Sequence, residues 1–135
     1  MRTIKFRFWN KIARRFQPAG KYAIDGEGKL VSYDYELGAY QDPEDFSNTI
    51  IVPQQYTGLK DKNDKEIYEG DIVHYVFDGA SHPKEAQDKY LTCVYDPDFG
   101  LFCFDDADSS YYWAEIRGYV EMIGNIFENS ELLKQ

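Results

Sequence analysis

The chain has 135 residues, of which 43% are hydrophobic and 17% aromatic, enough for a packed interior of one domain or two small sub-domains. Its formal net charge is −9, and no apolar run approaches the roughly 18 residues needed to cross a bilayer. The basic, aromatic N-terminus lacks the apolar core of a signal peptide, and the two cysteines, Cys93 and Cys103, give no disulfide framework. We therefore expect a reduced, cytoplasmic location and no membrane contact.

The first predicted strand covers residues 5–9, where cationic residues and Trp9 alternate with two phenylalanines. A period of two predicts a half-buried strand, with Phe6 and Phe8 on its buried face and the cations facing outward. Residues 12–16 are expected to pair back on this strand.

A hairpin follows, with strands at residues 22–24 and 30–33. The dipeptide Asp25-Gly26 between them supplies the positive φ that tight turns need. Residues 34–48 are polar and acidic and are expected to form a loop.

Residues 49–52 are rich in β-branched side chains and predict a strand that Pro53 ends. Short strands then recur at close spacing. We expect them at residues 66–68, 72–77, 91–95, 101–104, 111–116 and 119–127. The loop 78–89, the turn 96–100, a bulge or bend at Gly124 and a helical turn after Ser130 complete the pattern. Such spacing, with little helix, is typical of a small barrel.

The most distinctive segment covers residues 55–73 and reads Gln-Tyr-Thr-Gly-Leu-Lys-Asp-Lys-Asn-Asp-Lys-Glu-Ile-Tyr-Glu-Gly-Asp-Ile-Val. Its last five residues, Glu-Gly-Asp-Ile-Val, resemble the turn that leads into the first long strand of SH3-like barrels. The predicted architecture is therefore mainly β, with a basic, aromatic β-hairpin region at residues 1–54 and an SH3-like β-barrel at residues 55–135. Likeness at the level of the fold carries no function with it.

Three blocks in order along the chain resemble the YopX-like family of phages and prophages of low-GC Gram-positive bacteria. They are the basic-aromatic opening at residues 4–11, the signature at residues 55–73 and the final block Glu-Met-Ile-Gly-Asn-Ile-Phe-Glu-Asn-Ser-Glu-Leu-Leu at residues 121–133. Asp64 stands where the family has Gly, but Asp also tolerates the left-handed region, so a turn is still expected. Ser130 replaces a Pro. The resemblance implies a mainly-β fold and a phage or prophage origin, but no catalytic residues.

Charge is distributed unevenly along the chain. Residues 1–22 hold seven cations and no acid, so the other 113 residues carry 15 − 7 = 8 cations against 24 acids, a net charge of −16. The acidic body could neutralise the basic segment. Alternatively, this segment docks on the acidic surface of a neighbour, or it touches nucleic acid.

Candidate cofactor sites in the sequence are weak. Residues 61–66 begin like a calcium loop, but Lys65 and Glu66 occupy positions that need an oxygen ligand and a glycine. The acids between residues 96 and 108 could suit a hard cation, but acids in solvated loops give the same pattern, and solvated loops are the favoured interpretation. Neither His74 with His82 nor the two cysteines have zinc spacing. We expect no cofactor.

The aromatic residues 99, 102, 104 and 111–113 suit core packing or subunit contact better than base stacking. Residues 91–116 hold six acids and no Lys or Arg, and single-strand binding needs a cationic groove.

The sequence thus favours a non-enzymatic protein-binding module that binds a partner protein or itself. The expected partner contacts are Arg7, Trp9, Arg14 and Arg15 in the basic segment and Asp105, Asp106 and Asp108 in the acidic loops. One alternative is an acidic decoy that inhibits a host nucleic-acid-binding protein. Another is weak nucleic-acid binding through residues 1–22. An enzyme ranks last because no nucleophile–base pair can be proposed.

Overall fold

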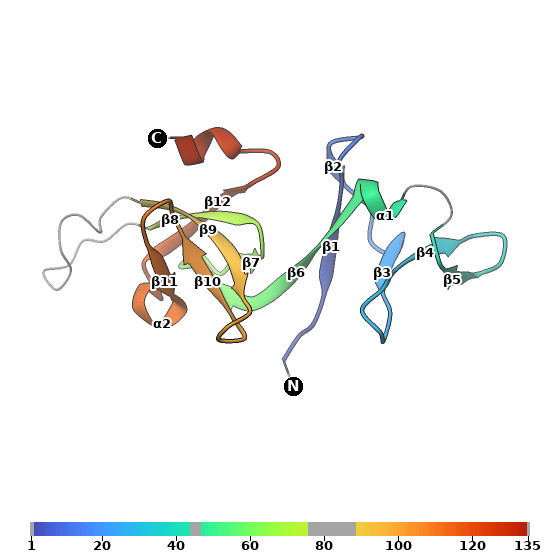
Figure 1. Cartoon of the computed structure of the whole chain (residues 1–135), viewed down its shortest axis with the longest axis horizontal. Coiled ribbons are helices and arrows are strands. Elements are labelled where there is room, and N and C mark those ends of the chain that lie inside the picture. Colours follow the sequence, from blue (N-terminus) through green and yellow to red (C-terminus); the bar gives the residue numbers. More distant parts are fainter. Residues whose placement is uncertain (1, 44–46, 76–88, 135) are drawn as a thin grey trace, which may run out of the picture. The chain divides into compact units, whose positions relative to one another are not determined.

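Strands dominate the computed structural model, which describes residues 2–43, 47–75 and 89–134 (Figure 1). The mainly-β prediction is confirmed, and each helix within these residues is a single short turn. The chain divides into two compact units. The N-terminal unit comprises residues 3–55, and the C-terminal unit comprises residues 56–135 with residues 1–2. This division lies one residue from the boundary expected from the sequence.

Two antiparallel sheets form the N-terminal unit. One joins β2 (Arg15–Phe16), β1 (Phe6–Asn10) and the first half of β6 (Ile51–Lys60), and the other joins β3 (Tyr22–Ile24), β4 (Leu30–Asp34) and β5 (Ala39–Gln41). The predicted return of the chain onto the first strand is confirmed, since Trp9 lies opposite Phe16. The hairpin of β3 and β4 is confirmed as well.

The turn of that hairpin differs in detail from the prediction. Asp25 Oδ1 accepts hydrogen bonds from the N–H groups of Glu27 at 2.8 Å and Lys29 at 3.0 Å. This longer turn places the positive φ, 84°, at Gly28 rather than at Gly26.

The loop prediction for residues 34–48 is wrong in part, because β5 lies within it and pairs with β4. The residues of β5 are largely exposed, so no alternation of apolar and polar residues marks it as a strand. Residues 44–46 lie outside the described residues, and α1 (Ser47–Ile50) follows them.

Pro53 does not end its strand, contrary to the prediction. The Phe8 carbonyl accepts a hydrogen bond from Gln17 N–H at 2.8 Å, so the backbone polar groups of Phe8 face β2 rather than β6. Pro53 lies opposite Phe8, so no backbone hydrogen bond to β1 is expected from position 53, and the missing N–H of proline costs nothing there. Within the described residues, no strand pairs with the other side of β6 before Tyr56. Proline is tolerated at such an open edge.

The C-terminal unit is built on one curled sheet. Its strands run in the order β11 (Ser110–Tyr112), β10 (Leu101–Asp105), β9 (Lys89–Asp96), β8 (Asp71–Tyr75) and β12 (Val120–Asn125), and the rest of β6 pairs with β7 (Glu66–Tyr68). Its fully buried core side chains include Ile67, Val73, Tyr75, Leu91, Phe104, Ile116 and Val120. Of the predicted strand 72–77 and loop 78–89, residues 76–88 lie outside the described residues.

The strand predicted at residues 111–116 ends early. Helix α2 (Trp113–Ile116) replaces its second half, and Arg117 N–H donates to the Trp113 carbonyl at 2.8 Å. Side chains three residues apart share one face of a helix. Trp113 and Ile116 can therefore both contact the core, whereas a strand would direct them to opposite faces.

The bulge predicted at Gly124 is confirmed by a shift in the register of β12 and β8 between Met122 and Gly124. The helical turn expected after Ser130 is the 3-10 helix η2 (Ser130–Lys134). Asp64 adopts a φ of 66°, so the turn survives the replacement of glycine.

The turn at residues 61–65 closes the curled sheet at its β12 edge. Lys62 N–H donates to the Val120 carbonyl at 3.1 Å, and Met122 N–H donates to Asp61 Oδ2 at 2.7 Å. These bonds satisfy an edge that would otherwise offer unpaired backbone groups. Among the described residues, none of the helices is long and apolar enough to span a membrane.

Candidate functional site

The loop between β1 and β2 is held in one shape by its own backbone and by Asn10. Asn10 Oδ1 accepts hydrogen bonds from Ile12 N–H and Ala13 N–H, both at 2.9 Å. Arg14 N–H donates to the Asn10 carbonyl at 2.8 Å, and Arg14 adopts a left-handed φ of 55°. A loop fixed in this way loses little conformational entropy when it binds a partner.

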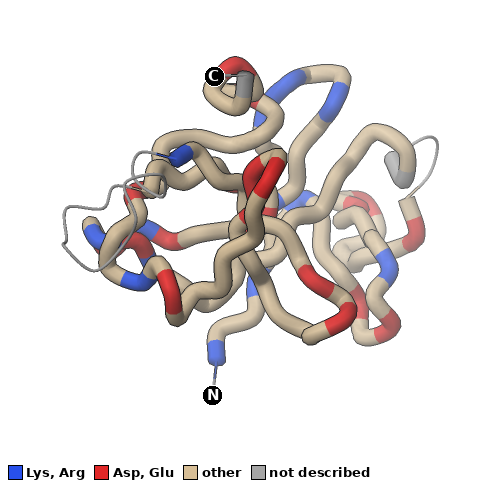
Figure 2. Tube along the Cα trace, turned by 60° about the vertical axis from the view of Figure 1, so that its left-hand side comes forward, with Lys and Arg blue, Asp and Glu red and all other residues tan. Residues whose placement is uncertain are grey.

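Residues 11–15, which we call the hairpin tip, present cations around an apolar side chain. Ile12 is 76% exposed. Lys11, Arg14 and Arg15 are exposed beside it in the sequence. Figure 2 shows these cations in blue along the loop near the top of the view. The combination of charge and exposed apolar surface suits a protein partner.

Two of the predicted contacts have internal roles instead. Trp9 is only 1% exposed, so its assignment as a partner contact is wrong. Its ring packs edge-on against Phe16 at 5.0 Å, while Phe8 on the opposite face of the strand packs against Tyr22 at 5.9 Å. Both faces of β1 are therefore covered, which alternation along one strand cannot reveal.

Arg7 also turns inward. Its Nε donates to Gln54 Oε1 at 2.8 Å, and its guanidinium lies 4.5 Å from the centre of the Phe16 ring. Gln54 is 3% exposed, so Arg7 satisfies a buried amide. Of the four basic-segment candidates, Arg14 and Arg15 lie on the exposed tip, and the tip adds Lys11 and Ile12, which the sequence did not single out.

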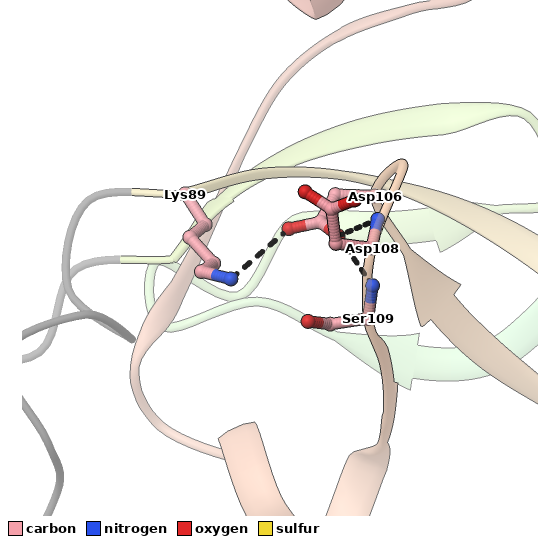
Figure 3. A network of polar contacts seen from close by, with 4 residues as sticks. All are labelled: Lys89, Asp106, Asp108 and Ser109. Carbon is pink, nitrogen blue, oxygen red and sulfur yellow. Dashed lines mark hydrogen bonds and ion pairs between the residues drawn. The ribbon is translucent and has the colours of Figure 1, made fainter.

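The predicted acidic contacts are mostly engaged within the C-terminal unit (Figure 3). Asp106 accepts from Lys89 Nζ at 3.2 Å and from the N–H groups of Asp108 at 2.8 Å and Ser109 at 2.7 Å. Asp105 accepts from the Ser110 hydroxyl. Only Asp108 of the three is exposed. Residues 105–108 are therefore a structured turn more than an open acidic surface.

The pKa values of Asp106 and Lys89, which form an ion pair, reflect these hydrogen bonds. Burial alone would raise the pKa of Asp106, but the hydrogen bonds from Asp108, Lys89 and Ser109 outweigh burial and lower it. Burial would lower the pKa of Lys89, but the hydrogen bonds with Asp106 and Tyr111 raise it. Both groups are therefore held in their charged forms.

A pocket of about 300 Å³ lies beside this ion pair. Its lining combines the charged pair with apolar side chains of η2, and consists of Lys89, Tyr90, Asp106, Ala107, Asp108, Leu132 and Leu133. The Lys89 and Asp106 side chains are 23% and 21% exposed. Because the two charges already neutralise each other, the pocket offers no unbalanced charge from this pair to a ligand.

The segment that begins like a calcium loop is a structural turn. Asp61 is 6% exposed, and its Oδ1 accepts from the N–H groups of Asn63 at 2.8 Å and Lys65 at 2.9 Å. Together with the bond from Met122, these bonds occupy both carboxylate oxygens. Within residues 2–43, 47–75 and 89–134, no group of three or more His, Cys, Asp or Glu side chains could hold a metal ion.

Within the described residues, neither the two cysteines nor His74 is placed as a reactive nucleophile. Cys93 and Cys103 form no disulfide with each other and are buried, and burial raises the pKa of Cys103 above its usual value. A buried neutral thiol is unreactive. His74 stacks on Tyr90 with ring centroids 4.8 Å apart, and His82 lies outside the described residues.

The aromatic residues divide into two groups. Phe104 is fully buried and packs against Trp113, with ring centroids 5.7 Å apart. By contrast, Phe99 is 70% exposed and Tyr95 is 50% exposed at the end of the β9–β10 hairpin. Core packing thus accounts for some of the rings but not for those at this hairpin end.

Two exposed hairpin ends and a buried framework thus define a β-rich protein without an evident catalytic centre in its described residues. The YopX protein family matches residues 5–134, so the chain belongs to the YopX family. Its structure is similar to the crystal structure of protein EF1440 from Enterococcus faecalis, with a TM-score of 0.63, 26% sequence identity and coverage of 98% of this chain and 99% of that chain. No curated protein is significantly similar to the chain in sequence.

Proposed function

We propose that this protein is a non-enzymatic binding module that docks its hairpin tip on an acidic protein surface, in the simplest case that of another copy. The observation that carries the proposal is the ordered tip, in which Ile12 is 76% exposed among exposed cations. We further propose, from the family alone, that it serves a phage or prophage in the cytoplasm of the bacterial host.

Charge favours self-association over a nucleic-acid partner. The 113 residues outside the basic segment carry a net charge of −16, counted as 8 cations against 24 acids. Such a body repels phosphate but attracts the basic tip of another copy. An exposed Ile12 gains from contact with an apolar side chain and gains nothing from a phosphate.

The proposal is tested by charge reversal at the two tip cations for which the structure shows no internal role. The double variant Lys11→Glu/Arg15→Glu should lower the weight-average mass measured by light scattering toward the 15.8 kDa of one chain. Arg14 is left unchanged because its guanidinium lies 5.9 Å from the centre of the Trp9 ring.

The matched control is Lys29→Glu/Lys62→Glu, which reverses two exposed cations outside the tip. The control variant should keep the mass of the wild-type protein. Equal masses for the wild type and the tip variant would overturn the proposal. A gel shift of single-stranded DNA that only the tip variant abolishes would assign the tip to nucleic acid instead.

A further inference from the structure

The end of the β9–β10 hairpin is a second ordered, exposed surface, and it differs in chemistry from the hairpin tip. Gly100 N–H donates to the Asp96 carbonyl at 2.8 Å, and Asp98 N–H donates to Asp96 Oδ1 at 2.9 Å. Gly100 adopts the left-handed φ of 67° that this turn requires. The turn is therefore fixed before any partner arrives.

Apolar side chains project from this turn beside an acid. Phe99 is 70% exposed, Tyr95 is 50% exposed and Leu101 is 39% exposed. Asp98 is exposed between them in the sequence. We call residues 95–101 the aromatic end. Large exposed rings at one site are typical of interaction surfaces.

The hairpin tip and the aromatic end are complementary in charge, and each also exposes an apolar side chain. The tip carries exposed cations, whereas the aromatic end contains Asp96 and the exposed Asp98 and no Lys or Arg. The tip also presents Ile12, and the aromatic end presents the exposed face of Phe99. Each surface therefore offers the other an opposite charge and an apolar contact.

We propose that the acidic surface bound by the hairpin tip is the aromatic end of a second copy of this chain. This inference rests on the proposed function and names its acceptor. The two surfaces differ, so two copies either pair both tips with both aromatic ends in a closed two-fold dimer or pair one of each and leave one tip and one aromatic end unoccupied. In the second case association continues into rings or open chains.

The contact is small and joins exposed charges of opposite sign, and both properties determine how strongly it binds. Two hairpin ends bury less than the roughly 800 Å² per partner of a standard interface. Association is therefore weak and concentration-dependent, and salt weakens it because the charges are exposed.

The test uses two variants of the full chain, each lacking one surface. One is Lys11→Glu/Arg15→Glu, and the other is Asp98→Lys/Phe99→Ser. Each variant alone should sediment as a single chain of 15.8 kDa at concentrations where the wild type is larger. An equimolar mixture should form a complex of two chains and no more, because one intact tip meets one intact aromatic end.

The control for the second variant is Glu131→Lys/Leu133→Ser, which changes an exposed acid and an exposed apolar residue elsewhere in the same unit. It should associate like the wild type. Circular dichroism of all variants should match the wild type, because the altered side chains are exposed.

Three results would contradict the inference in distinguishable ways. If only the tip variant loses association, the proposed function stands and the aromatic end is not the acceptor. If both variants are single chains but the mixture forms no complex, the two surfaces do not pair. If neither variant changes the mass, the proposed function and the inference both fail.

Discussion

At the scale of single residues, Asp61 shows how the family signature is used. Its carboxylate accepts three backbone N–H groups, from Asn63, Lys65 and Met122. One side chain therefore shapes the turn at residues 61–65 and fastens that turn to β12.

We predict that Asp61→Asn lowers the free energy of unfolding at pH 7 by about 1–3 kcal/mol, because an amide nitrogen replaces one acceptor oxygen. Burial would raise the pKa of Asp61, but hydrogen bonds from Met122, Lys65 and Asn63 outweigh burial and hold the pKa below 3.8. The carboxylate's contribution is thus complete above 3.8 and is lost as the pH falls through the lower folded-state pKa.

Urea unfolding at pH 7 and at about pH 3 measures this difference. The difference in free energy of unfolding between Asp61→Asn and the wild type should be smaller at the lower pH. Asp64→Asn on the same turn is the control and should be nearly neutral, because the Asp64 side chain is 85% exposed. A gap that is independent of pH would show that the charge of Asp61 contributes nothing.

At the scale of elements, the end of β12 depends on the close approach of Gly124 and Asn129. A Cβ at position 124 would lie 2.3 Å from Asn129 Oδ1, the atom that accepts a hydrogen bond from Asn125 N–H at 3.2 Å. The glycine therefore makes room for the side chain that joins β12 to the turn before η2.

We predict that Gly124→Ala destabilises the protein by about 1–3 kcal/mol, because the added Cβ forces the Asn129 side chain to move. The same change should cost less in an Asn129→Ala background, and denaturant unfolding of the double-mutant cycle measures the coupling. Gly26→Ala is the matched control, since a Cβ at position 26 would meet nothing within 4 Å. Additive effects at positions 124 and 129 would refute the steric explanation.

A second element-scale prediction concerns the ion pair between β9 and the turn after β10. A double-mutant cycle of Lys89→Met and Asp106→Asn should give a coupling of up to about 1 kcal/mol at pH 7. The exposed pair Lys60–Asp64, at 3.8 Å, is the control and should give a coupling near zero.

The coupling should depend on pH at both extremes. The lowered pKa of Asp106 means that its contribution is lost as the pH falls below 3.8, toward its folded-state pKa. The raised pKa of Lys89 means that its contribution is lost as the pH rises above 10.5, toward its folded-state pKa. A coupling that persists unchanged at about pH 2 would contradict this electrostatic origin.

Local signals explain why much of the fold is predictable from the sequence. The alternation at residues 5–9, the Asp-rich turns and the bulge at Gly124 each act within a few residues. The mistaken elements depend on neighbours that are distant in sequence. Pro53 remains in a strand because its edge is open, and Trp113 enters a helical turn because the core lies on one side.

The site is less predictable than the fold for the same reason. Charge composition pointed to Arg14 and Arg15, but only packing shows that Arg7 bonds Gln54 and that Trp9 is buried. Likewise, Lys89 and Asp106 are 17 residues apart, and no periodicity predicts their contact. The SH3-like character of the barrel stays a prediction.

At the scale of the whole molecule, the chain combines a basic segment with an acidic remainder. Seven cations and no acid in residues 1–22 stand against a net charge of −16 in the rest. The exposed hairpin tip places part of this positive charge on one defined surface. We propose that the protein associates with itself through this tip.

Sedimentation of the wild-type chain over a range of concentrations, at low and at high salt, is the direct test of this self-association. At low salt the weight-average mass should rise with concentration above the 15.8 kDa of one chain, and high salt should reverse the rise. A mass that stays at 15.8 kDa at every concentration in low salt would contradict the claim.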